Sequence, residues 1–364
     1  MKHRYNLRLF LFLLFLAFAV PNAAFAEPEK FRIAVIIPLS GQVASLGTYV
    51  RKGIDLAIES LPSRERDTLE VIYEDDQFDP VQTIGAYRKL KATGKIDAVF
   101  VVGSPPANAL GPITEKDKTI LVAIGASDPS IAVGKTYSFI HWVIPPVLGE
   151  KLADEMMKRD FKKIAFVVAD VTGAIADVDA AIDALKKRDA GERVIYRQDF
   201  IKNTTDYRSV LTKIRQEKAD AVVAVLFSGA LASFAKQFRE LRIQADLIGM
   251  ETFEDEAEVK ASNNTLVGAW YVNASDSTSE FVEAYKKRYQ EHPGWGTGNG
   301  YDSLKLISLA VKNVGSSSDK IRDFLRSVKD YSGATGTYSA SGDNRFTLPA
   351  ALKKVTQDGF ESFN

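Results

Sequence analysis

Short runs of valine and isoleucine alternate with amphipathic segments along most of this 364-residue chain, and this order restricts the possible folds more than any other feature. The first four runs are Phe31–Leu39, Leu69–Tyr73, Ala98–Val102 and Ile120–Ile124. Continuous apolar strands that alternate with helices are typical of parallel sheets covered by helices on both faces. The sequence therefore predicts an α/β fold of doubly wound parallel sheets.

The segments between the runs carry helix signals. Asp79 and Pro80 predict an N-cap followed by proline at the first helical position. One apolar face is then predicted at Val81, Ile84, Tyr87 and Leu90. A second stripe at helical spacing consists of Tyr207, Val210, Leu211 and Ile214. Each of these helices is therefore expected to bury one side.

The same alternation starts again after Pro145-Pro146, which predicts a second sheet. Its strands are expected at Ile164–Val168, Arg193–Asp199, Ala221–Phe227, Asp246–Met250 and Leu266–Val272. Three successive helices follow, at Ser279–Glu291, Gly300–Val314 and Asp319–Val328, and then a Gly/Ser-rich stretch at Ser332–Asp343. Because three helices build no third sheet, we expect the chain to return to the first domain there.

The N-terminus has the order of a secretory signal peptide. Three basic residues precede 12 apolar residues, Leu9–Val20, and Ala24-Phe25-Ala26 follows. The apolar run is shorter than the ~20 residues of a membrane-spanning helix. We therefore expect residues 1–26 to be cleaved on export and the mature protein to reside in the periplasm; the alternative is a retained anchor helix.

Composition restricts the partners. The chain has no cysteine, so its 338 mature residues must be stabilised by core burial without disulfides or a lipid-modified cysteine. Loss of the signal peptide leaves 44 basic and 47 acidic residues, a net charge of −3. This balance gives no electrostatic reason to expect nucleic acid or anionic lipid as a partner. The length suits two domains.

Catalytic and metal-binding motifs are scarce. Outside the signal peptide the histidines are His141 and His292, neither in a spacing such as H-E-x-x-H. Gly134-Lys135-Thr136 resembles the end of a phosphate loop, but Pro129 occupies the place of the required glycine. The acidic run Glu74–Asp76 could be a metal site or a solvated turn that caps the next helix. We predict no catalytic residue, no metal and no cofactor.

Open α/β sheets bind ligands beyond the carboxyl ends of their strands. This rule selects Ser40-Gly41, Gly103-Ser104, Gly125-Ala126-Ser127, Asp170–Gly173, Phe227-Ser228 and Glu251. Ser127 could hold a carboxylate, Phe227 could form an apolar wall or cation–π face, and Glu251 could neutralise an ammonium group. The alternatives are a helix cap, a core position and a solvated acidic run, respectively. Convergence at the strand ends favours a shared binding site.

Five segments, in this order and spacing, resemble periplasmic binding proteins of the leucine/isoleucine/valine-binding type, which serve branched-chain amino acid ABC importers. They are Ile33–Gly53 (IAVIIPLSGQVASLGTYVRKG), Tyr73–Pro80 (YEDDQFDP), Gly125–Pro129 (GASDP), Gly300–Ser303 (GYDS) and Gly333–Asp343 (GATGTYSASGD). The resemblance covers essentially the whole mature chain. It implies the type I periplasmic binding fold, in which two Rossmann-like sheet domains grip a ligand between them.

The resemblance also implies three hinge crossings between the domains. We expect them near His141–Pro146, Tyr271–Ser275 and Gly336–Asp343. One lobe is predicted to contain residues 27–143 plus 275–338, and the other residues 144–274 plus 339–364.

Site residues follow from the resemblance position by position. Glu251 matches the glutamate that binds an α-ammonium group, and Phe227 falls where a tyrosine is common. The sequence departs from the family pattern in two places that normally hold the ligand's carboxylate, here called the carboxylate clamp. The loop that is usually rich in hydroxyl groups is Ser104-Pro105-Pro106-Ala107-Asn108, and the tyrosine usual near Thr172 is missing. The predicted ligand-binding residues are Leu46, Ser104, Asn108, Gly125, Ala126, Ser127, Thr172, Phe227 and Glu251.

These features predict a non-catalytic, monomeric solute-binding component of an ABC importer. We expect it to bind an amino acid or related small metabolite between two closing lobes and to present it to the importer's membrane subunits. The altered clamp keeps an aromatic or aliphatic carboxylate, or an amide, open as the ligand. Other open classes are a subunit that presents its ligand to a signalling receptor, an enzyme on the same fold, and a structural protein without a ligand.

Overall fold

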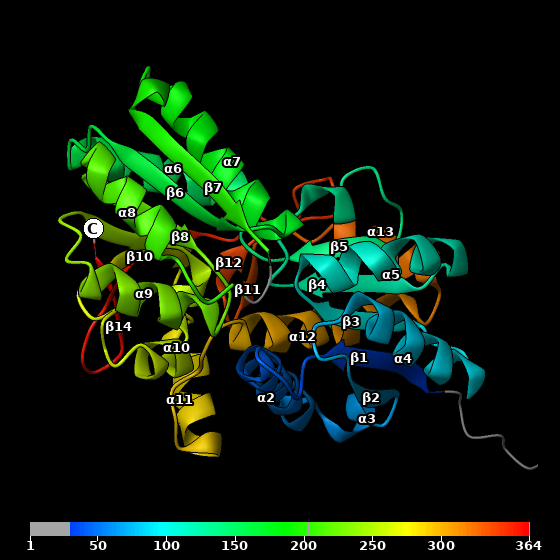
Figure 1. Ribbon diagram of the computed structural model, residues 1–364. Helices are drawn as coiled ribbons and strands as arrows, with labels where there is room; N and C mark the ends of the chain where they lie inside the picture. Colours follow the sequence, from blue (N-terminus) through cyan, green and yellow to red (C-terminus); the bar gives the residue numbers. More distant parts are fainter. Residues whose placement is uncertain (1–29, 202–203, 364) are drawn as a thin grey trace, which may run out of the picture. The chain divides into compact units, whose positions relative to one another are not determined.

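The computed structural model describes residues 30–201 and 204–363, and the predicted signal peptide lies outside them. In this described part, the first sheet has five parallel strands in the order β2-β1-β3-β4-β5 (Figure 1). They are β1 Phe31–Ile37, β2 Leu69–Asp75, β3 Ala98–Val102, β4 Ile120–Ile124 and β5 Ser138–His141. The first four confirm the predicted runs. Strand β5 was not predicted, because only two of its four residues are apolar.

The second sheet has seven strands within the described residues, in the order β14-β13-β10-β9-β8-β6-β7. They are β6 Ile164–Ala169, β7 Val194–Phe200, β8 Ala221–Val225, β9 Asp246–Gly249, β10 Trp270–Ala274, β13 Ala350–Val355 and β14 Phe360–Phe363. The strands from β10 to β7 are parallel, and their positions agree with the prediction except that β10 starts four residues later than expected. Strands β13 and β14 add an antiparallel edge that was not predicted.

Helices cover both sheets. They are α2 Ala44–Ser60, α3 Ser63–Arg66, α4 Pro80–Ala92, α5 Ser104–Asp117, α6 Pro145–Lys158, α7 Thr172–Lys186, α8 Arg208–Glu217, α9 Ala230–Glu240, α10 Glu256–Ala261, α11 Ser279–Tyr289, α12 Thr297–Val314 and α13 Ser318–Arg326, with 3₁₀ turns η1 Pro129–Ile131, η2 Gly191–Arg193 and η3 Glu251–Glu254. On the first sheet α4 packs against α5 and α2 against α12, while α6 and α7 pack together on the second. The helix pairs thus form layers around each sheet.

Helix α4 shows where the local prediction was right and where it was wrong. The Asp79 carboxylate accepts hydrogen bonds from the backbone N–H groups of Val81 and Gln82, at 2.8 and 3.0 Å, which confirms the N-cap. Val81 itself is 77% exposed, so it does not belong to the buried stripe. That stripe contains Thr83, Tyr87 and Leu90 instead. The stripe on α8 is confirmed, because Tyr207, Val210, Leu211 and Ile214 are all buried.

The chain passes between the two sheets three times, after β5, after β10 and before β13. The return to the first sheet after β10 brings α12 against α2, as expected. Before the last crossing, Asn344 still contacts the first sheet: its Nδ2 donates to the Ser138 carbonyl at 3.0 Å, and its own carbonyl accepts from the Ile140 N–H at 3.0 Å. The third crossing therefore lies near Ala350, later than the predicted Gly336–Asp343. The lobe boundaries stay a prediction.

The Gly/Ser-rich stretch near the end of the chain is a hairpin of β11 Tyr331–Gly333 and β12 Gly336–Tyr338. Asp302 of α12, which is fully buried, holds the turn, because its carboxylate accepts from the N–H groups of Ala334 and Thr335 at 2.7 and 3.0 Å. A buried carboxylate that accepts several N–H bonds stabilises such a turn.

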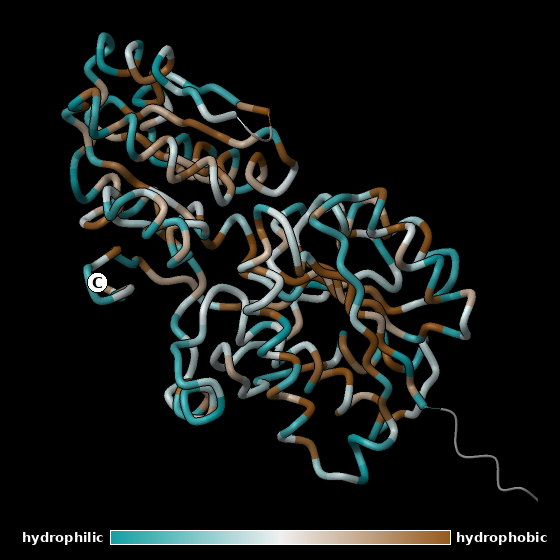
Figure 2. Tube along the Cα trace, turned by 60° about the horizontal axis from the view of Figure 1, so that its bottom comes forward, coloured by the Kyte–Doolittle hydropathy of each residue, from teal (hydrophilic) through white to brown (hydrophobic). Residues whose placement is uncertain are grey.

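The apolar residues follow the strands of both sheets, and the charged residues gather on the outer turns and helix faces (Figure 2). One continuous cluster of buried side chains runs from the first sheet through Trp142 to the second. Of the residues that the structure describes, no helix has both the length and the apolar content needed to cross a membrane.

Candidate ligand-binding site

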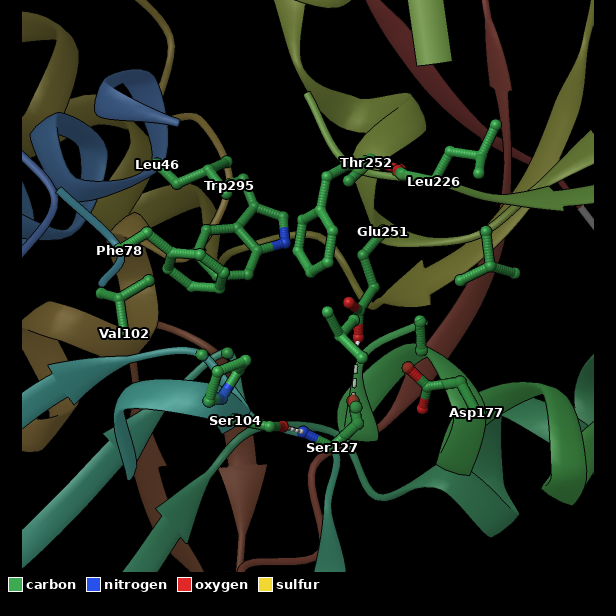
Figure 3. A pocket seen from close by; sticks show the side chains of 18 residues that line it. Leu46, Phe78, Val102, Ser104, Ser127, Asp177, Leu226, Glu251, Thr252 and Trp295 are labelled. Atoms are coloured by element: carbon green, nitrogen blue, oxygen red, sulfur yellow. Dashed lines mark hydrogen bonds between the residues drawn. The ribbon is translucent and has the colours of Figure 1, made fainter. Parts of the chain in front are cut away.

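A cavity that is partly open to solvent lies where loops from both sheets meet (Figure 3). The first sheet contributes the loops after β3 and β4, and the second sheet those after β6, β8 and β9. The lining residues are Leu46, Phe78, Val102, Gly103, Ser104, Pro105, Gly125, Ser127, Val171, Gly173, Ala174, Asp177, Val225, Leu226, Phe227, Glu251, Thr252 and Trp295.

The structure brings six of the nine predicted residues together at this cavity, namely Leu46, Ser104, Gly125, Ser127, Phe227 and Glu251. The other three lie elsewhere. Ala126 is buried in the hydrophobic core. Asn108 Nδ2 donates to Asp128 at 2.7 Å and to the Thr172 hydroxyl at 3.1 Å, so these two predicted residues bind each other across the two halves of the chain. Their positions favour a role in lobe contact over direct ligand contact.

Glu251 begins η3, directly after β9, and its carboxylate enters the cavity (Figure 3). Oε1 accepts from the Trp142 indole N–H and from the Ser127 hydroxyl, the latter at 3.3 Å. Trp142 follows β5 and Ser127 follows β4, so both donors come from the first sheet's side. The residue as a whole is partly buried. Burial of its carboxyl group raises the pKa to about 7, although the two hydrogen bonds act in the opposite direction and lower the pKa. Glu251 can therefore respond to charge in the cavity at neutral pH.

Asp177 is a second acid in the cavity, and it was not predicted. It lies on α7, is 1% exposed, and shares the buried face of that helix with Ala174, Val178 and Ala181. Its Oδ1 has no hydrogen-bond partner in the described chain. Burial and the charge of Glu251 hold the pKa of Asp177 well above its usual value. The sequence signal that could have identified Asp177 is an acidic residue within the apolar stripe of a helix.

Aromatic rings form the opposite wall. Trp295 precedes α12 and lies against Gly125, whose φ of +64° and missing side chain admit the ring; a Cβ there would come within 2.0 Å of it. Phe78 packs in the same way against Gly103 and lies 5.5 Å from Phe227, measured between ring centroids. Phe78 and Trp295 were not predicted. Phe78 follows β2 and so obeys the strand-end rule, whereas Trp295 lies just before a helix and does not.

Through its hydroxyl, Ser104 uses backbone donors that were expected to hold a ligand carboxylate. Its hydroxyl oxygen accepts from the backbone N–H groups of Ser127 and Asp128, at 3.1 and 3.2 Å. It also begins α5, where Pro105 and Pro106 lack N–H groups that could bind an anion. The backbone donors expected to hold a carboxylate are therefore either used by the protein or removed.

The acidic run before α4 has a different role from both predicted ones. Asp75 accepts from the N–H groups of Leu39 and Gln77, at 2.8 and 3.0 Å. Asp76 is fully buried and accepts from the Phe78 N–H and the Thr83 hydroxyl, at 2.9 and 2.8 Å. These bonds shape the loop that presents Phe78 to the cavity. Across residues 30–201 and 204–363, no group of three or more His, Cys, Asp or Glu side chains is arranged to hold a metal ion.

His141 lies in the core outside the cavity. Its Nε2 lies 2.9 Å from the Tyr338 hydroxyl, and burial lowers its pKa to about 3. It is therefore neutral and structural at physiological pH.

Comparison with known proteins identifies the family. A family model described as periplasmic binding protein matches residues 30–360. The Leu/Ile/Val-binding protein homolog 3 of Brucella melitensis is 24% identical over 337 residues, which cover 88% of this chain and 90% of that protein.

Solved structures share the fold. A leucine-binding protein of Thermotoga maritima superposes with a TM-score of 0.85 at 19% identity, covering 92% of this chain and 98% of that one. A solute-binding protein of an ABC transporter from R. palustris, in complex with benzoate, gives 0.82 at 19% identity, covering 92% and 96%.

A cleft site between two parallel-sheet domains defines a solute-binding protein of the type I fold, and the structural neighbours confirm that fold. The chain belongs to the periplasmic binding protein family, within the branched-chain amino acid group that its relatives represent.

Proposed function

We propose that this protein is the solute-binding component of an ABC importer and that it binds an amino acid or a related amine-bearing metabolite in the cavity. It acts in the periplasm, as a monomer and without catalysis, and presents the bound solute to the importer's membrane subunits. The observation that carries the proposal is the carboxylate of Glu251 in a cavity with an aromatic wall, a complement to an ammonium group on an apolar body.

The site receives residues from both proposed lobes, one built on the first sheet and the other on the second. Ser127 belongs to the first lobe and Glu251 to the second, and the two already share a hydrogen bond of 3.3 Å. A solute that contacts both lobes stabilises the closed form by its additional contacts there. That form is then what the membrane subunits recognise.

An aromatic carboxylate is the second candidate. The benzoate in the R. palustris neighbour and the three rings around this cavity, Phe78, Phe227 and Trp295, favour it. The two acids in the cavity, Glu251 and Asp177, disfavour binding of a negatively charged ligand. A subunit that presents its solute to a receptor would use the same site.

Mass spectrometry of small molecules that copurify with the protein tests the proposal, followed by a thermal-shift screen of amino acids, amines and aromatic acids. A bound ligand raises the melting temperature by mass action. We expect stabilisation by at least one amine-bearing compound. A protein that no compound in the panel stabilises would not be a binder of this class.

The variant Glu251→Gln tests the central contact. Glutamine keeps the shape and an acceptor for Trp142 but loses the charge, so binding of an amine-bearing solute should weaken by at least ~1.4 kcal/mol, a tenfold rise in Kd. Isothermal titration calorimetry measures it. Glu256→Gln, which changes an exposed acid outside the cavity, serves as the control and should leave Kd unchanged. Equal affinities for both variants would remove Glu251 from the site.

A further inference from the structure

The cavity has an unusual charge composition. Two carboxylates line it, Glu251 from η3 and Asp177 from α7. Among the lining residues of the described chain there is no lysine, arginine or histidine. The remaining polar side chains are the hydroxyls of Ser104, Ser127 and Thr252 and the indole of Trp295, all of which are neutral. A ligand with a net positive charge is therefore complementary, and an anion is not.

Asp177 forms no ion pair within the described residues. Its side chain points from α7 toward the region of Glu251 and Ser127 (Figure 3), it is 1% exposed, and its Oδ1 lacks a hydrogen-bond partner in the described residues. A buried carboxyl group with one oxygen unbonded lowers stability, and its place in the cavity suits it to bind a ligand. The free oxygen is a ready acceptor for a ligand N–H.

The donors around Ser127 that were predicted to hold a carboxylate are already engaged within the protein. The N–H groups of Ser127 and Asp128 donate to Ser104, and the Ser127 hydroxyl donates to Glu251. The two prolines at the start of α5 supply no further donors. A free carboxylate on the ligand would have to displace these bonds in a cavity that already holds two acids.

The opposite wall suits an apolar body. Trp295 and Phe78 face the acids across the cavity (Figure 3), and Leu46 and Val102 extend this side. Aromatic faces also attract an ammonium group by cation–π interaction.

We infer that the preferred ligand is a small primary amine, bound as its ammonium cation, with an apolar aliphatic or aromatic body and no free carboxylate. This inference rests on the proposed function and narrows its ligand class. One ammonium group balances one ionised acid, and the second acid stays protonated and can donate a hydrogen bond within the cavity.

Matched ligand sets test the inference on the mature protein by calorimetry. The first set is 3-methylbutylamine, leucine and 4-methylpentanoate, and the second is 2-phenylethylamine, phenylalanine and 3-phenylpropanoate. The three compounds of each set have a similar apolar body. The amine carries only the ammonium group, the acid carries only the carboxylate, and the amino acid carries both. We expect at least one amine to bind tenfold or more tightly than its matched amino acid, with the acid weakest. An amino acid or acid that binds more tightly than its matched amine in both sets would overturn the inference.

The variant Asp177→Asn separates this inference from the proposed function. It should weaken amine binding about tenfold, because one of the two acids is lost, and leave the amino acid unchanged or improved, because the amide offers its carboxylate an N–H donor. Asp183→Asn, on the exposed face of α7 where Asp183 pairs with Lys186 at 2.9 Å, is the matched control and should change neither.

The outcomes of the two tests are distinguishable. An unchanged ratio of amine to amino acid affinity in Asp177→Asn, with far-ultraviolet circular dichroism of the native form, would overturn the inference. Amino acids that bind best and lose affinity only in Glu251→Gln would overturn it while the proposed function stands. Absence of binding by every class would overturn both.

Discussion

At the scale of single residues, Asp177 and Glu251 form the energetic centre of the site. Each acid is held where its charged form is poorly solvated, and the charge of Glu251 further opposes ionisation of Asp177. The Ser127 hydroxyl, which donates to Glu251, is close enough to favour ionisation of both acids. Without a cation, the pair reduces the stability of the fold, and a bound ammonium would relieve that cost.

The acids predict an unusual dependence of stability on pH. Glu251 has a pKa of about 7 in the folded protein against an ordinary 4.5, so the folded state binds its proton more tightly than the unfolded chain. Its contribution therefore favours the fold below pH ~4.5 and is lost as the pH rises to ~7, by at most ~3 kcal/mol at ~1.4 kcal/mol per pKa unit. The only other titratable group that lines the described cavity is Asp177, with a shift in the same direction.

Denaturant unfolding of the ligand-free protein at pH 5 and pH 8 measures this effect. We expect Glu251→Gln to raise the free energy of unfolding more at pH 8 than at pH 5. The exposed-acid variant Glu256→Gln should show no such difference. A gain of equal size at both pH values would mean that the carboxyl of Glu251 is not shifted.

Six of the nine predicted residues line the cavity, and five of them obey one rule, a position shortly after a parallel strand; the sixth, Leu46, lies in α2 and was expected from the family resemblance. Phe78 obeys the same rule and was overlooked among the acids of its loop. Asp177 and Trp295 lie on a helix and before a helix, and their place in the cavity depends on how the two halves of the chain pack. No local pattern contains that information.

At the scale of elements, strand β13 links the edge of the second sheet to the site. Lys353 in this strand is 2% exposed, and its Nζ donates to Glu254 of η3 at 2.8 Å and forms an ion pair with Asp276 at 2.8 Å. Glu254 also accepts from Asn273 Nδ2 of β10 at 2.7 Å. The turn that begins with Glu251 is therefore tied to two strands of the sheet.

Replacement of Lys353 tests this link. Lys353→Met removes the cation and leaves Glu254 with an uncompensated, largely buried charge, so we expect a loss of ~3 kcal/mol in the free energy of unfolding. Lys354→Met changes the next residue of β13, which is exposed, and should alter stability by less than ~0.5 kcal/mol. Urea unfolding measures both, and similar losses in the two variants would show that the ion pair contributes nothing specific.

The two lysines also explain why β13 was not predicted. They interrupt the apolar pattern of Ala350–Val355, although one of them is buried by its ion pairs. Strand β5 was missed for a related reason, since Ser138 and His141 are buried polar residues that bond to Glu115 and Tyr338. Tertiary partners, not local preference, make these segments strands.

At the scale of the whole molecule, the site depends on contacts between residues far apart in the chain. Phe78 follows a strand of the first sheet and Phe227 a strand of the second, and their rings lie 5.5 Å apart. Ser45 of α2 donates to Asp255 at 3.0 Å, which adds a polar contact between the same halves. A ligand that fills the cavity would touch both sides at once.

The variant Phe227→Ala tests whether this aromatic pair serves binding or the fold. Phe227 is only partly buried, so its removal should leave far-ultraviolet circular dichroism unaltered and raise Kd for the best ligand of the panel about tenfold. Phe238→Ala, which removes a buried ring of the second domain's core, should instead lower the melting temperature with little effect on Kd. Unfolding of Phe227→Ala would make the residue part of the core.

The sequence by itself determined the α/β class, the order of the parallel strands along the chain, the family and most of the loops that form the site. It could do so because strand and helix periodicity, caps and strand ends are local properties of neighbouring residues. Only the tertiary structure decided that Asp177 and Trp295 enter the cavity, that Ser104 occupies the anion donors, and that β13 completes the second sheet. Those features arise from burial and charge pairing between distant segments, whose energies no local pattern records.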